Sequence, residues 1–416
     1  MDFGINLATA ADSFKIVKRA EELGYARAWF YDTQMLNADV FVAMGAAAVQ
    51  TSKIRLATGV LIPSNRIAPV AASALASLNA LAPGRIDFGI STGFTARRAM
   101  GLGPVKLGDM EEYIRIVQRL LAGDTLEWTF EGQRRKIRFL NPELGVFNVQ
   151  DPIPLHLSAL GPRGRQLTAR LGAGWLYATG GMEPAKAAVG DMQAAWRAAG
   201  VDPASRVATA FTGGAVLKDG EAFDSPRAKA QAGPHATIAL HNLVEVEQFG
   251  NMGRSVPPQL KPLLERYREM YRTYEPADAR YLTNHRGHLM FLRPEEHEVC
   301  TADLIRMLTF TATRPELQDR IRELRAAGYN HFSIHIRHGH PEMLEEWADV
   351  FAGVSRRDRS GSVSEHRTEG LERERALFRR EVRAEEQHRE GGAGLVPAAE
   401  SPPRLGWGAV DDQLLE

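Results

Sequence analysis

The sequence reads Ile54-Arg-Leu-Ala-Thr-Gly-Val-Leu-Ile62, continues through a run of small residues to Ala80, and then reads Arg85-Ile-Asp-Phe-Gly-Ile-Ser-Thr-Gly93. An apolar run, a segment with helical character and a second apolar run predict a strand, a helix and a strand. Parallel strands joined by a helix have their carboxyl ends at one edge of a sheet, where α/β folds bind ligands. The small residues there, Thr58-Gly59 and Thr92-Gly93, let a flat ligand approach the backbone closely.

The same alternation extends over residues 1–353 and predicts eight strands. We expect them at residues 3–7, 28–31, 54–62, 85–93, 153–159, 174–177, 206–217 and 329–336. Eight strands that alternate with helices, without an internal repeat, favour a (β/α)8 TIM barrel of the α/β class. An open doubly wound sheet is the alternative. Such a sheet more often has a GxGxxG turn after its first strand, and this sequence has none there.

One excursion from the barrel is expected before the fifth strand. Asp109 is placed to cap a helix over residues 110–121, because it directly precedes the apolar periodic run. Thr125–Leu140 then shows two runs of alternating character around the turn residues 130–133. This pattern predicts a β-hairpin.

Two further segments do not follow the alternation of strands and helices. Lys218–Cys300 comes after the seventh strand and is expected to be an insertion with helical pieces. Beyond Gly353 the composition becomes rich in arginine and glutamate, and later in proline and glycine. We expect residues 354–416 to form a charged, disordered tail that adds nothing to the barrel core, apart from a helix at Glu372–Glu386.

Composition limits the classes of partner. The chain has 416 residues, of which 44% are hydrophobic, a formal net charge of zero and a single cysteine, Cys300. Zero net charge gives no general attraction to nucleic acid or to a membrane surface, so neither is expected as a partner. One cysteine excludes an internal disulfide and a CxxC metal site. The chain enters an apolar strand at Phe3 without a basic region or a long apolar run, so we expect a cytoplasmic protein with no signal peptide and no membrane span.

Five segments in the same order resemble the bacterial-luciferase-like flavin and deazaflavin oxidoreductases. They are Leu56–Pro63 with Pro69–Leu78, Gly84–Gly93, Pro154–Pro162, Gly172–Trp175, and Asn284–Leu289 with Thr309–Thr313. The resemblance covers roughly residues 1–353. It implies a TIM barrel with a large insertion after the seventh strand, which suits Lys218–Cys300, and an oxidoreductase that uses FMN or the deazaflavin F-420.

Two segments are the main candidates for holding the cofactor. Gly161-Pro162 lies between a strand and a helix, and the free N–H groups at a helix start suit a phosphate, with Arg163 and Arg165 adding charge. Taken alone these residues also fit an ordinary tight turn, and the resemblance favours the phosphate. Thr58-Gly59-Val60 matches the position where the family often has a non-prolyl cis peptide that bulges towards the flavin ring; a plain strand end is the alternative. The resemblance also implies cofactor contacts from Asp32, Thr92, Gly93 and Ser158.

The sequence departs from its relatives at two positions. Many relatives have an acidic residue followed by histidine after the second strand, and this chain has Asp32-Thr33. A threonine hydroxyl does not titrate near neutral pH, whereas a histidine does. Phe94 stands where the sugar-oxidising deazaflavin members have a glutamate acid. Both departures argue against transferring the proton chemistry of those members to this chain. Asp32 is left with binding the cofactor or capping the following turn.

Histidines of the insertion are the remaining candidates for proton transfer. His285 and His288 are three residues apart and would share one face of a helix. Because general catalysis works best with a pKa near the working pH, we predict that His288 and His285 act as acid or base, with a bracing role as the alternative. We expect no metal site, since the sequence offers no carboxylate beside them at metal-binding spacing and no HExxH pattern. His335, His338 and His340 end the eighth strand, where such a cluster either touches substrate, binds a stray metal ion or belongs to a solvated loop.

Three functions remain open. The leading hypothesis is a two-component monooxygenase, in which reduced FMN from a separate flavin reductase reacts with dioxygen and a small organic substrate is oxygenated. The second is a reductase or dehydrogenase that uses the deazaflavin F-420 and transfers hydride directly. The third, of another class, is a non-catalytic flavin-binding barrel protein. The resemblance also implies a homodimer.

Overall fold

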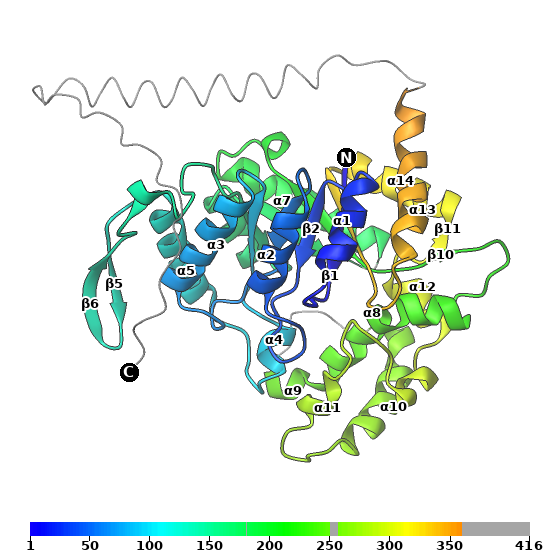
Figure 1. Ribbon diagram of the computed structural model, residues 1–416. Coiled ribbons are helices and arrows are strands. Elements are labelled where there is room, and N and C mark those ends of the chain that lie inside the picture. Colours follow the sequence, from blue (N-terminus) through cyan, green and yellow to red (C-terminus); the bar gives the residue numbers. More distant parts are fainter. Residues whose placement is uncertain (180, 250–256, 360–416) are drawn as a thin grey trace, which may run out of the picture. The chain divides into compact units, whose positions relative to one another are not determined.

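The structure, a computed structural model, describes residues 1–179, 181–249 and 257–359. Met1–Arg357 form one compact unit, whose elements are labelled in Figure 1. The last described helix, α14 (Met343–Arg359), runs past the boundary expected at Gly353. The predictions for residues 360–416, including the helix at Glu372–Glu386, lie outside the described residues.

Eight parallel strands close into a barrel in the order β1-β12-β9-β8-β7-β4-β3-β2. They are β1 (Asp2–Leu7), β2 (Arg27–Phe30), β3 (Arg55–Thr58), β4 (Ile86–Ile90), β7 (Leu155–Ser158), β8 (Gly174–Ala178), β9 (Ala208–Thr212) and β12 (His331–His335). The first and last strands are neighbours, with Asn6 opposite His335. The predicted (β/α)8 barrel is therefore confirmed, and the open sheet is excluded.

Helices pack around the outside of the barrel, several of them side by side in Figure 1. Besides α14 they are α1 (Phe14–Glu22), α2 (Val40–Gln50), α3 (Ala68–Leu81), α5 (Leu107–Leu121), α6 (Pro162–Arg170), α7 (Met182–Ala198) and α13 (Arg314–Ala327). Small side chains decide the spacing on one side, since Ala71, Ala72 and Leu75 of α3 are fully buried. A helix with small residues on its inner face can lie close to the sheet, and this brings the loops at both ends of the barrel into a fixed position.

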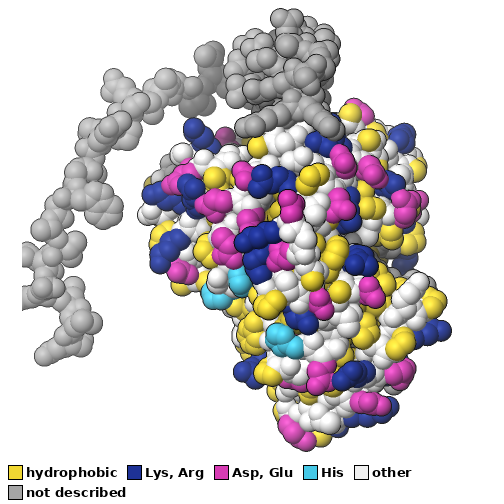
Figure 2. Space-filling view, turned by 90° about the vertical axis from the view of Figure 1, so that its right-hand side faces the viewer, with side chains coloured by type: hydrophobic (Ala, Val, Ile, Leu, Met, Phe, Trp, Pro, Cys, Tyr) yellow, Lys and Arg dark blue, Asp and Glu magenta, His cyan; other side chains and the backbone are white. Residues whose placement is uncertain are grey.

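Acidic and basic side chains are interspersed over the face shown in Figure 2, in keeping with the net charge of zero. Within the described residues, no helix combines the length and the apolar character required to cross a membrane.

The amino ends of the strands enclose a charged cluster inside the barrel. The Asp87 carboxylate accepts hydrogen bonds from Arg27 Nε at 2.8 Å and from Arg55 Nε and Nη2 at 2.9 and 2.8 Å. His156 Nε2 lies 3.5 Å from the same carboxylate. Gly174 leaves room for this imidazole, because a Cβ there would lie 2.3 Å from His156 Nδ1. We call this cluster the barrel floor. Because its opposite charges balance one another in a closed interior, at the end of the barrel away from the usual ligand site, it contributes to stability rather than to chemistry.

The predicted hairpin is present, as β5 (Leu126–Phe130) and β6 (Gln133–Ile137). The preceding helix differs from its prediction. It begins at Leu107 with Lys106 at the N-cap, and Asp109 lies in its first turn. Asp109 therefore stabilises the helix start through its charge near the positive end of the dipole, not as the capping residue.

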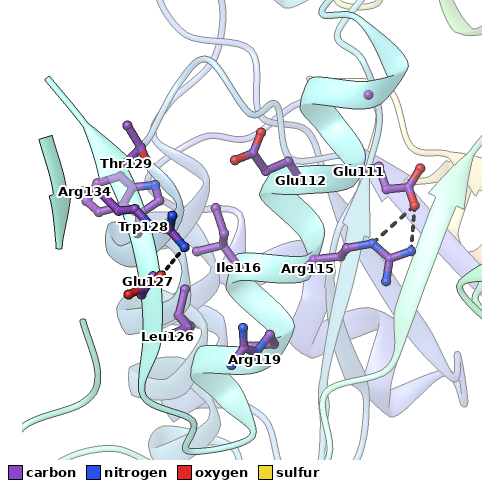
Figure 3. Close-up of a pocket in the computed structure, with 11 residues that line it drawn as sticks. Glu111, Glu112, Arg115, Ile116, Arg119, Leu126, Glu127, Trp128, Thr129 and Arg134 are labelled. Atoms are coloured by element: carbon purple, nitrogen blue, oxygen red, sulfur yellow. Dashed lines mark hydrogen bonds and ion pairs between the residues drawn. The ribbon is translucent and has the colours of Figure 1, made fainter. Parts of the chain in front are cut away.

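A shallow hollow separates the hairpin from α5 (Figure 3). It is lined by charged side chains that pair with one another, Glu127 with Arg134 across the hairpin and Glu111 with Arg115 along the helix. None of the predicted cofactor residues lines it. This hollow is an outer surface feature and not the candidate site.

The predicted seventh strand, Arg206–Leu217, is divided in the structure. Its first part is β9 of the barrel, whereas β10 (Val216–Leu217) pairs in parallel with β11 (Ala312–Thr313) in a separate two-stranded sheet. The chain leaves the barrel at Gly213-Gly214. A Cβ at Gly214 would lie 2.2 Å from the Phe310 carbonyl oxygen, so the two segments approach at van der Waals contact only because glycine is there.

The segment between β9 and β12 contains the predicted insertion, which has its own apolar core. Its helices are α8 (Pro226–Val244), α9 (Val246–Phe249), α10 (Lys261–Arg272), α11 (Tyr281–Asn284) and α12 (Ala302–Leu308). The insertion also has short 3-10 helices at Pro258–Leu260 and Pro294–Glu298, and two others lie earlier in the chain, at Pro142–Leu144 and Pro203–Ser205. Leu240, Leu264, Ile305 and Cys300 are among the residues of the insertion core. Burial raises the pKa of the Cys300 thiol to about 12, so the thiol is protonated at neutral pH.

Candidate functional site

We call the edge formed by the carboxyl ends of the barrel strands the barrel mouth. Asp32 lies at this edge, after the end of β2. One oxygen of its buried carboxylate accepts from the Ile62 N–H at 3.2 Å, and the other accepts from Arg66 Nη1 at 2.9 Å. Arg66 also pairs with Asp39, the N-cap of α2. Asp32 therefore fixes the loop that follows β3 against the end of β2, and this places the loop at the mouth.

The Gly59–Val60 peptide bond is cis, as the family resemblance implied. Before it, the Thr58 hydroxyl donates to the Gly89 carbonyl at 2.7 Å and accepts from the Gly89 N–H at 2.9 Å. A Cβ at Gly89 would lie 2.1 Å from the Thr58 carbonyl oxygen, so only glycine fits there. The buried Thr58 side chain thus joins β3 to β4, and the partly exposed Val60 is the residue of this segment that is accessible at the mouth.

Two neighbouring strand ends supply hydroxyl groups. The Ser91 hydroxyl donates to the Ser158 carbonyl at 3.1 Å, which joins the ends of β4 and β7. Thr92 and Ser158 are partly exposed. Gly93 has a φ of 78°, and a Cβ there would lie 2.6 Å from the Ile62 side chain. The predicted residues Thr92, Gly93 and Ser158 are therefore gathered at one side of the mouth.

The start of α6 carries the predicted phosphate residues. Gly161 is the N-cap, Pro162 is the first helical residue, and both are exposed together with Arg163. The neighbouring Arg165 donates to the Leu160 carbonyl at 2.8 Å and pairs with Asp191 at 2.8 Å. Arg163, by contrast, makes no side-chain hydrogen bond or ion pair with any residue that the structure describes. Of the two arginines, Arg163 is the one free to meet an anion at the helix start.

A hydrogen-bonded chain of polar side chains crosses the mouth between the first and last strands. Asn6 Nδ2 donates to the Tyr31 hydroxyl at 2.8 Å, and that hydroxyl lies 2.8 Å from His335 Nδ1. His335 Nε2 lies 3.1 Å from the Leu289 carbonyl of the insertion, so it carries the proton and Nδ1 accepts from Tyr31. Burial lowers the pKa of His335 well below its usual value and raises the pKa of Tyr31, so both are neutral at pH 7.

The other two histidines of the predicted cluster do not join this chain. His338 is exposed, and His340 is partly buried and pairs with Glu342 at 2.9 Å. The hypothesis of a substrate contact therefore applies to His335 alone within this group.

Of the two positions that depart from the relatives, Phe94 has a structural role. Thr33 is partly exposed after Asp32. Phe94 precedes α4 (Thr95–Arg98), and the Arg98 guanidinium lies 3.9 Å from the centre of its ring. Arg98 also donates to the Asn242 carbonyl at 3.2 Å. The aromatic residue that replaces a glutamate thus stacks on a buried arginine that connects the barrel to the insertion.

His285 follows α11 of the insertion directly, and His288 contacts Thr95 of α4 at the barrel mouth. His288 Nε2 lies 3.0 Å from the Thr95 hydroxyl, and His285 Nε2 lies 3.0 Å from a Glu245 oxygen. Both imidazoles are buried. Burial lowers the pKa of His288 well below its usual value, which keeps it neutral at pH 7. The structure brings both histidines to the mouth, but with ring nitrogens turned towards protein partners.

Sequence reasoning missed the residues that surround these histidines. His241 of α8 lies 3.1 Å from His288 through their Nδ1 atoms, and Glu296 lies 2.5 Å from His241 Nε2. The sequence predicts no carboxylate partner for these histidines, because Glu245 and Glu296 do not lie at metal-binding spacing from them in the sequence. The available signal was His241 in the predicted insertion, with Glu245 four residues later.

Proteins of two kinds are similar to this chain in sequence. An F420-dependent glucose-6-phosphate dehydrogenase from Beutenbergia cavernae is 34% identical over 145 residues, which are 33% of this chain and 41% of that protein. A 5,10-methylenetetrahydromethanopterin reductase from Methanolobus tindarius is 29% identical over 245 residues, 58% of this chain and 71% of that protein. The match therefore spans less than half of the length of the first relative.

Solved structures share the fold. The coenzyme F420-dependent tetrahydromethanopterin reductase from Methanopyrus kandleri has a TM-score of 0.61 at 20% identity, over 83% of this chain and 97% of that chain. A monooxygenase from Streptomyces bottropensis has a TM-score of 0.54 at 17% identity, over 85% of this chain and 99% of that chain. The family model of luciferase-like monooxygenases matches residues 5–331. Since that match covers most of the chain and the barrel agrees with it, this protein belongs to the luciferase-like monooxygenase family.

Proposed function

We propose that this protein is an oxidoreductase that binds a deazaflavin of the F420 type and passes hydride between it and a small organic substrate. The observation that carries this proposal is the sequence similarity to two kinds of enzyme. One is an F420-dependent dehydrogenase, and the other is a reductase of methylenetetrahydromethanopterin. The FMN monooxygenase hypothesis has less support. It rests on solved structures under 25% identical, which carry the fold alone.

The mouth offers groups that fit such a cofactor. The exposed helix start at Gly161 and the free Arg163 suit its phosphate. The partly exposed hydroxyls of Thr92 and Ser158 suit polyol oxygens, and Val60 after the cis peptide suits a flat ring face. When bound, the deazaflavin supplies the hydride chemistry. Asp32 contributes indirectly, since it fixes the loop beside this surface.

Proton transfer is assigned to Tyr31. Its hydroxyl is protonated at neutral pH, and it lies between the Asn6 amide and His335 Nδ1 at the mouth. When Tyr31 gives its proton to a substrate oxygen, the Asn6 amide, which already donates to the hydroxyl oxygen, stabilises the tyrosinate until solvent water returns a proton. Thr33 and Phe94 offer no such group.

The predicted acid or base role of His288 and His285 is replaced in this proposal. Nε2 of His288 is held by the Thr95 hydroxyl, and Nε2 of His285 is held by the Glu245 carboxylate. A histidine with a pKa far below neutral and no exposed nitrogen is a poor general acid at pH 7. We assign both histidines to positioning the insertion over the mouth, which limits access of water.

One experiment tests the cofactor. The purified protein is titrated in parallel with F420, reduced FMN and oxidised FMN. Oxidised F420 is then mixed anaerobically with alcohols and sugar phosphates, which can give it hydride, and reduced F420 is mixed with aldehydes, which can accept hydride from it. We expect F420 to bind most tightly and one substrate class to change its visible absorbance. Tighter binding of reduced FMN, with oxygen consumption, would restore the monooxygenase hypothesis and the flavin reductase as a partner. Binding of either cofactor without any turnover would favour the non-catalytic alternative.

Replacing Arg163 with alanine is expected to weaken F420 binding about tenfold, the loss of one charge-assisted contact of roughly 1.5 kcal/mol. The deazaflavin without its phosphate should bind the wild type and the variant alike. Arg170→Ala is the matched control, because Arg170 is an exposed arginine at the other end of α6 that pairs with Glu111. Equal losses for the two ligands would place the phosphate elsewhere. Calorimetric titration measures all six combinations of the three proteins and the two ligands.

A further inference from the structure

Three histidines from separate parts of the insertion come together in its interior. His241, His285 and His288, called the histidine cluster below, are each at most 3% exposed. One nitrogen of each lies within 4.8 Å of a nitrogen of the other two. The cluster lies beside α4, at the junction of the insertion and the barrel mouth. Three imidazoles at this separation are a set of donors that proteins use for transition metals.

Each histidine has one nitrogen bound to an outer partner, and that nitrogen is Nε2 in all three. The partner of His241 is Glu296 at 2.5 Å, that of His285 is Glu245 at 3.0 Å, and that of His288 is the Thr95 hydroxyl at 3.0 Å. A carboxylate accepts the Nε2 proton and thereby leaves the lone pair on Nδ1. Metal-binding histidines have this arrangement, in which an outer carboxylate or hydroxyl orients the ring.

The three Nδ1 atoms face one another, and binding an ion displaces the one proton that His241 and His288 share between their Nδ1 atoms. Nδ1 of His285 is buried without a hydrogen-bond partner. Nδ1 of His241 lies 3.1 Å from Nδ1 of His288. Zinc–nitrogen bonds of about 2.0–2.1 Å in a tetrahedral site place two ligand nitrogens about 3.3 Å apart. One pair of the cluster is already close to this separation, and the third imidazole, within 4.8 Å of the others, has to approach by up to about 1.5 Å.

Two buried carboxylates lie directly behind the ring nitrogens of the cluster. Each of them also pairs with an arginine, Glu296 with Arg293 at 2.8 Å and Glu245 with Arg98 at 3.5 Å. Buried carboxylates in this position also offset the charge that a divalent ion brings.

We propose that His241, His285 and His288 bind one divalent transition-metal ion, with zinc as the best match, through their three Nδ1 atoms. Nitrogen donors of this kind suit zinc, and three protein ligands leave a fourth position for water. The ion would tie α8 to the 285–288 segment and, through Thr95, to α4 of the barrel. It would hold the insertion in place beside the mouth. This inference does not depend on the identity of the redox cofactor.

The test begins with the tag-free full-length protein after dialysis against a chelator. Zinc chloride is titrated in by calorimetry, and cobalt chloride is titrated in a second sample to record the absorption of the ion. We expect one ion per chain, an intense visible cobalt spectrum typical of a tetrahedral site, and a melting temperature that rises with zinc. Stoichiometric binding is a property of the wild type, so the result does not depend on whether a variant folds.

Variants assign the ion to the cluster. His285→Gln should abolish one-to-one binding, and Glu245→Gln should weaken it about 10-fold to 100-fold, the usual effect of losing an outer carboxylate. His297→Gln is the matched control, because His297 is an exposed histidine on the same insertion. The proposal is overturned if the wild type binds no zinc beyond a weak surface level. It is also overturned if His285→Gln folds and binds zinc as the wild type does, since the cluster would then be a hydrogen-bonded brace.

Discussion

Replacing Asp87 with alanine should lower the free energy of unfolding by about 3–5 kcal/mol, the cost of removing one partner of a buried ion pair. The carboxylate is fully buried, and it is the anion between Arg27 and Arg55 on the barrel floor. Without it, two guanidinium groups remain in the interior with no opposite charge. Urea unfolding followed by circular dichroism measures the change. Asp349→Ala, which breaks an exposed pair with Arg314, is the control and should change the free energy far less.

The same carboxylate predicts a pH dependence. Burial alone would raise the pKa of Asp87, but the charges of Arg27 and Arg55 and the contact with His156 hold it well below its ordinary value of 3.8. A depressed folded-state pKa means that this stabilisation is fully present above about pH 4 and is lost as the pH falls through the folded value. Asp87→Asn should therefore flatten the fall in stability below pH 4. An unchanged acid limb would show that the floor cluster does not control acid unfolding.

Replacing Tyr31 with phenylalanine should reduce turnover by about 10² or more, the low end for losing a general acid or base, while cofactor binding is kept. The change removes one oxygen and leaves the ring, which stacks on His335 at 5.4 Å. Single-turnover hydride transfer is measured with the substrate found in the cofactor experiment. A solvent isotope effect present in the wild type should be absent in the variant.

Tyr25→Phe is the matched control for this result. Tyr25 is also buried, and its hydroxyl donates to the Leu344 carbonyl at 2.8 Å, outside the mouth. Its loss should cost about 0.5–1.5 kcal/mol of stability and leave turnover unchanged. If both variants lose turnover in proportion to their stability, Tyr31 is a structural residue and the proton comes from another group.

Local patterns in the sequence were enough to predict the barrel. Runs such as Ile54–Ile62 and Arg85–Gly93 are bounded by turn residues, and the turn at 130–133 specified the hairpin. The pattern failed at the seventh strand, because the apolar run Arg206–Leu217 is continuous in sequence although its two halves pair with different strands. Apolar periodicity reports burial, and both halves are buried, so it does not reveal the change of sheet.

The candidate site was predictable only in part. The family resemblance implied the cis peptide at Gly59-Val60, local sequence predicted the helix start at Gly161, and the structure has both. The pairing of Tyr31 with His335 spans 304 residues, and it follows only once the barrel is assumed to close and β1 to lie beside β12. His241 and Glu296 are 55 residues apart on elements whose packing is set by the insertion core. The spacing of these two residues in the sequence does not predict that they are in contact.

The buried Cys300 makes the insertion separately observable. It is the only cysteine of the chain and lies in the insertion core, protonated and shielded from solvent. A thiol reagent can modify it only when that core opens, so the labelling rate under native conditions reports a local opening equilibrium, independent of the melting of the barrel. Zinc at the histidine cluster should slow this labelling, whereas a ligand confined to the barrel mouth should leave it nearly unchanged. The labelling rate of one thiol can thus show whether a given ligand stabilises the insertion or the barrel.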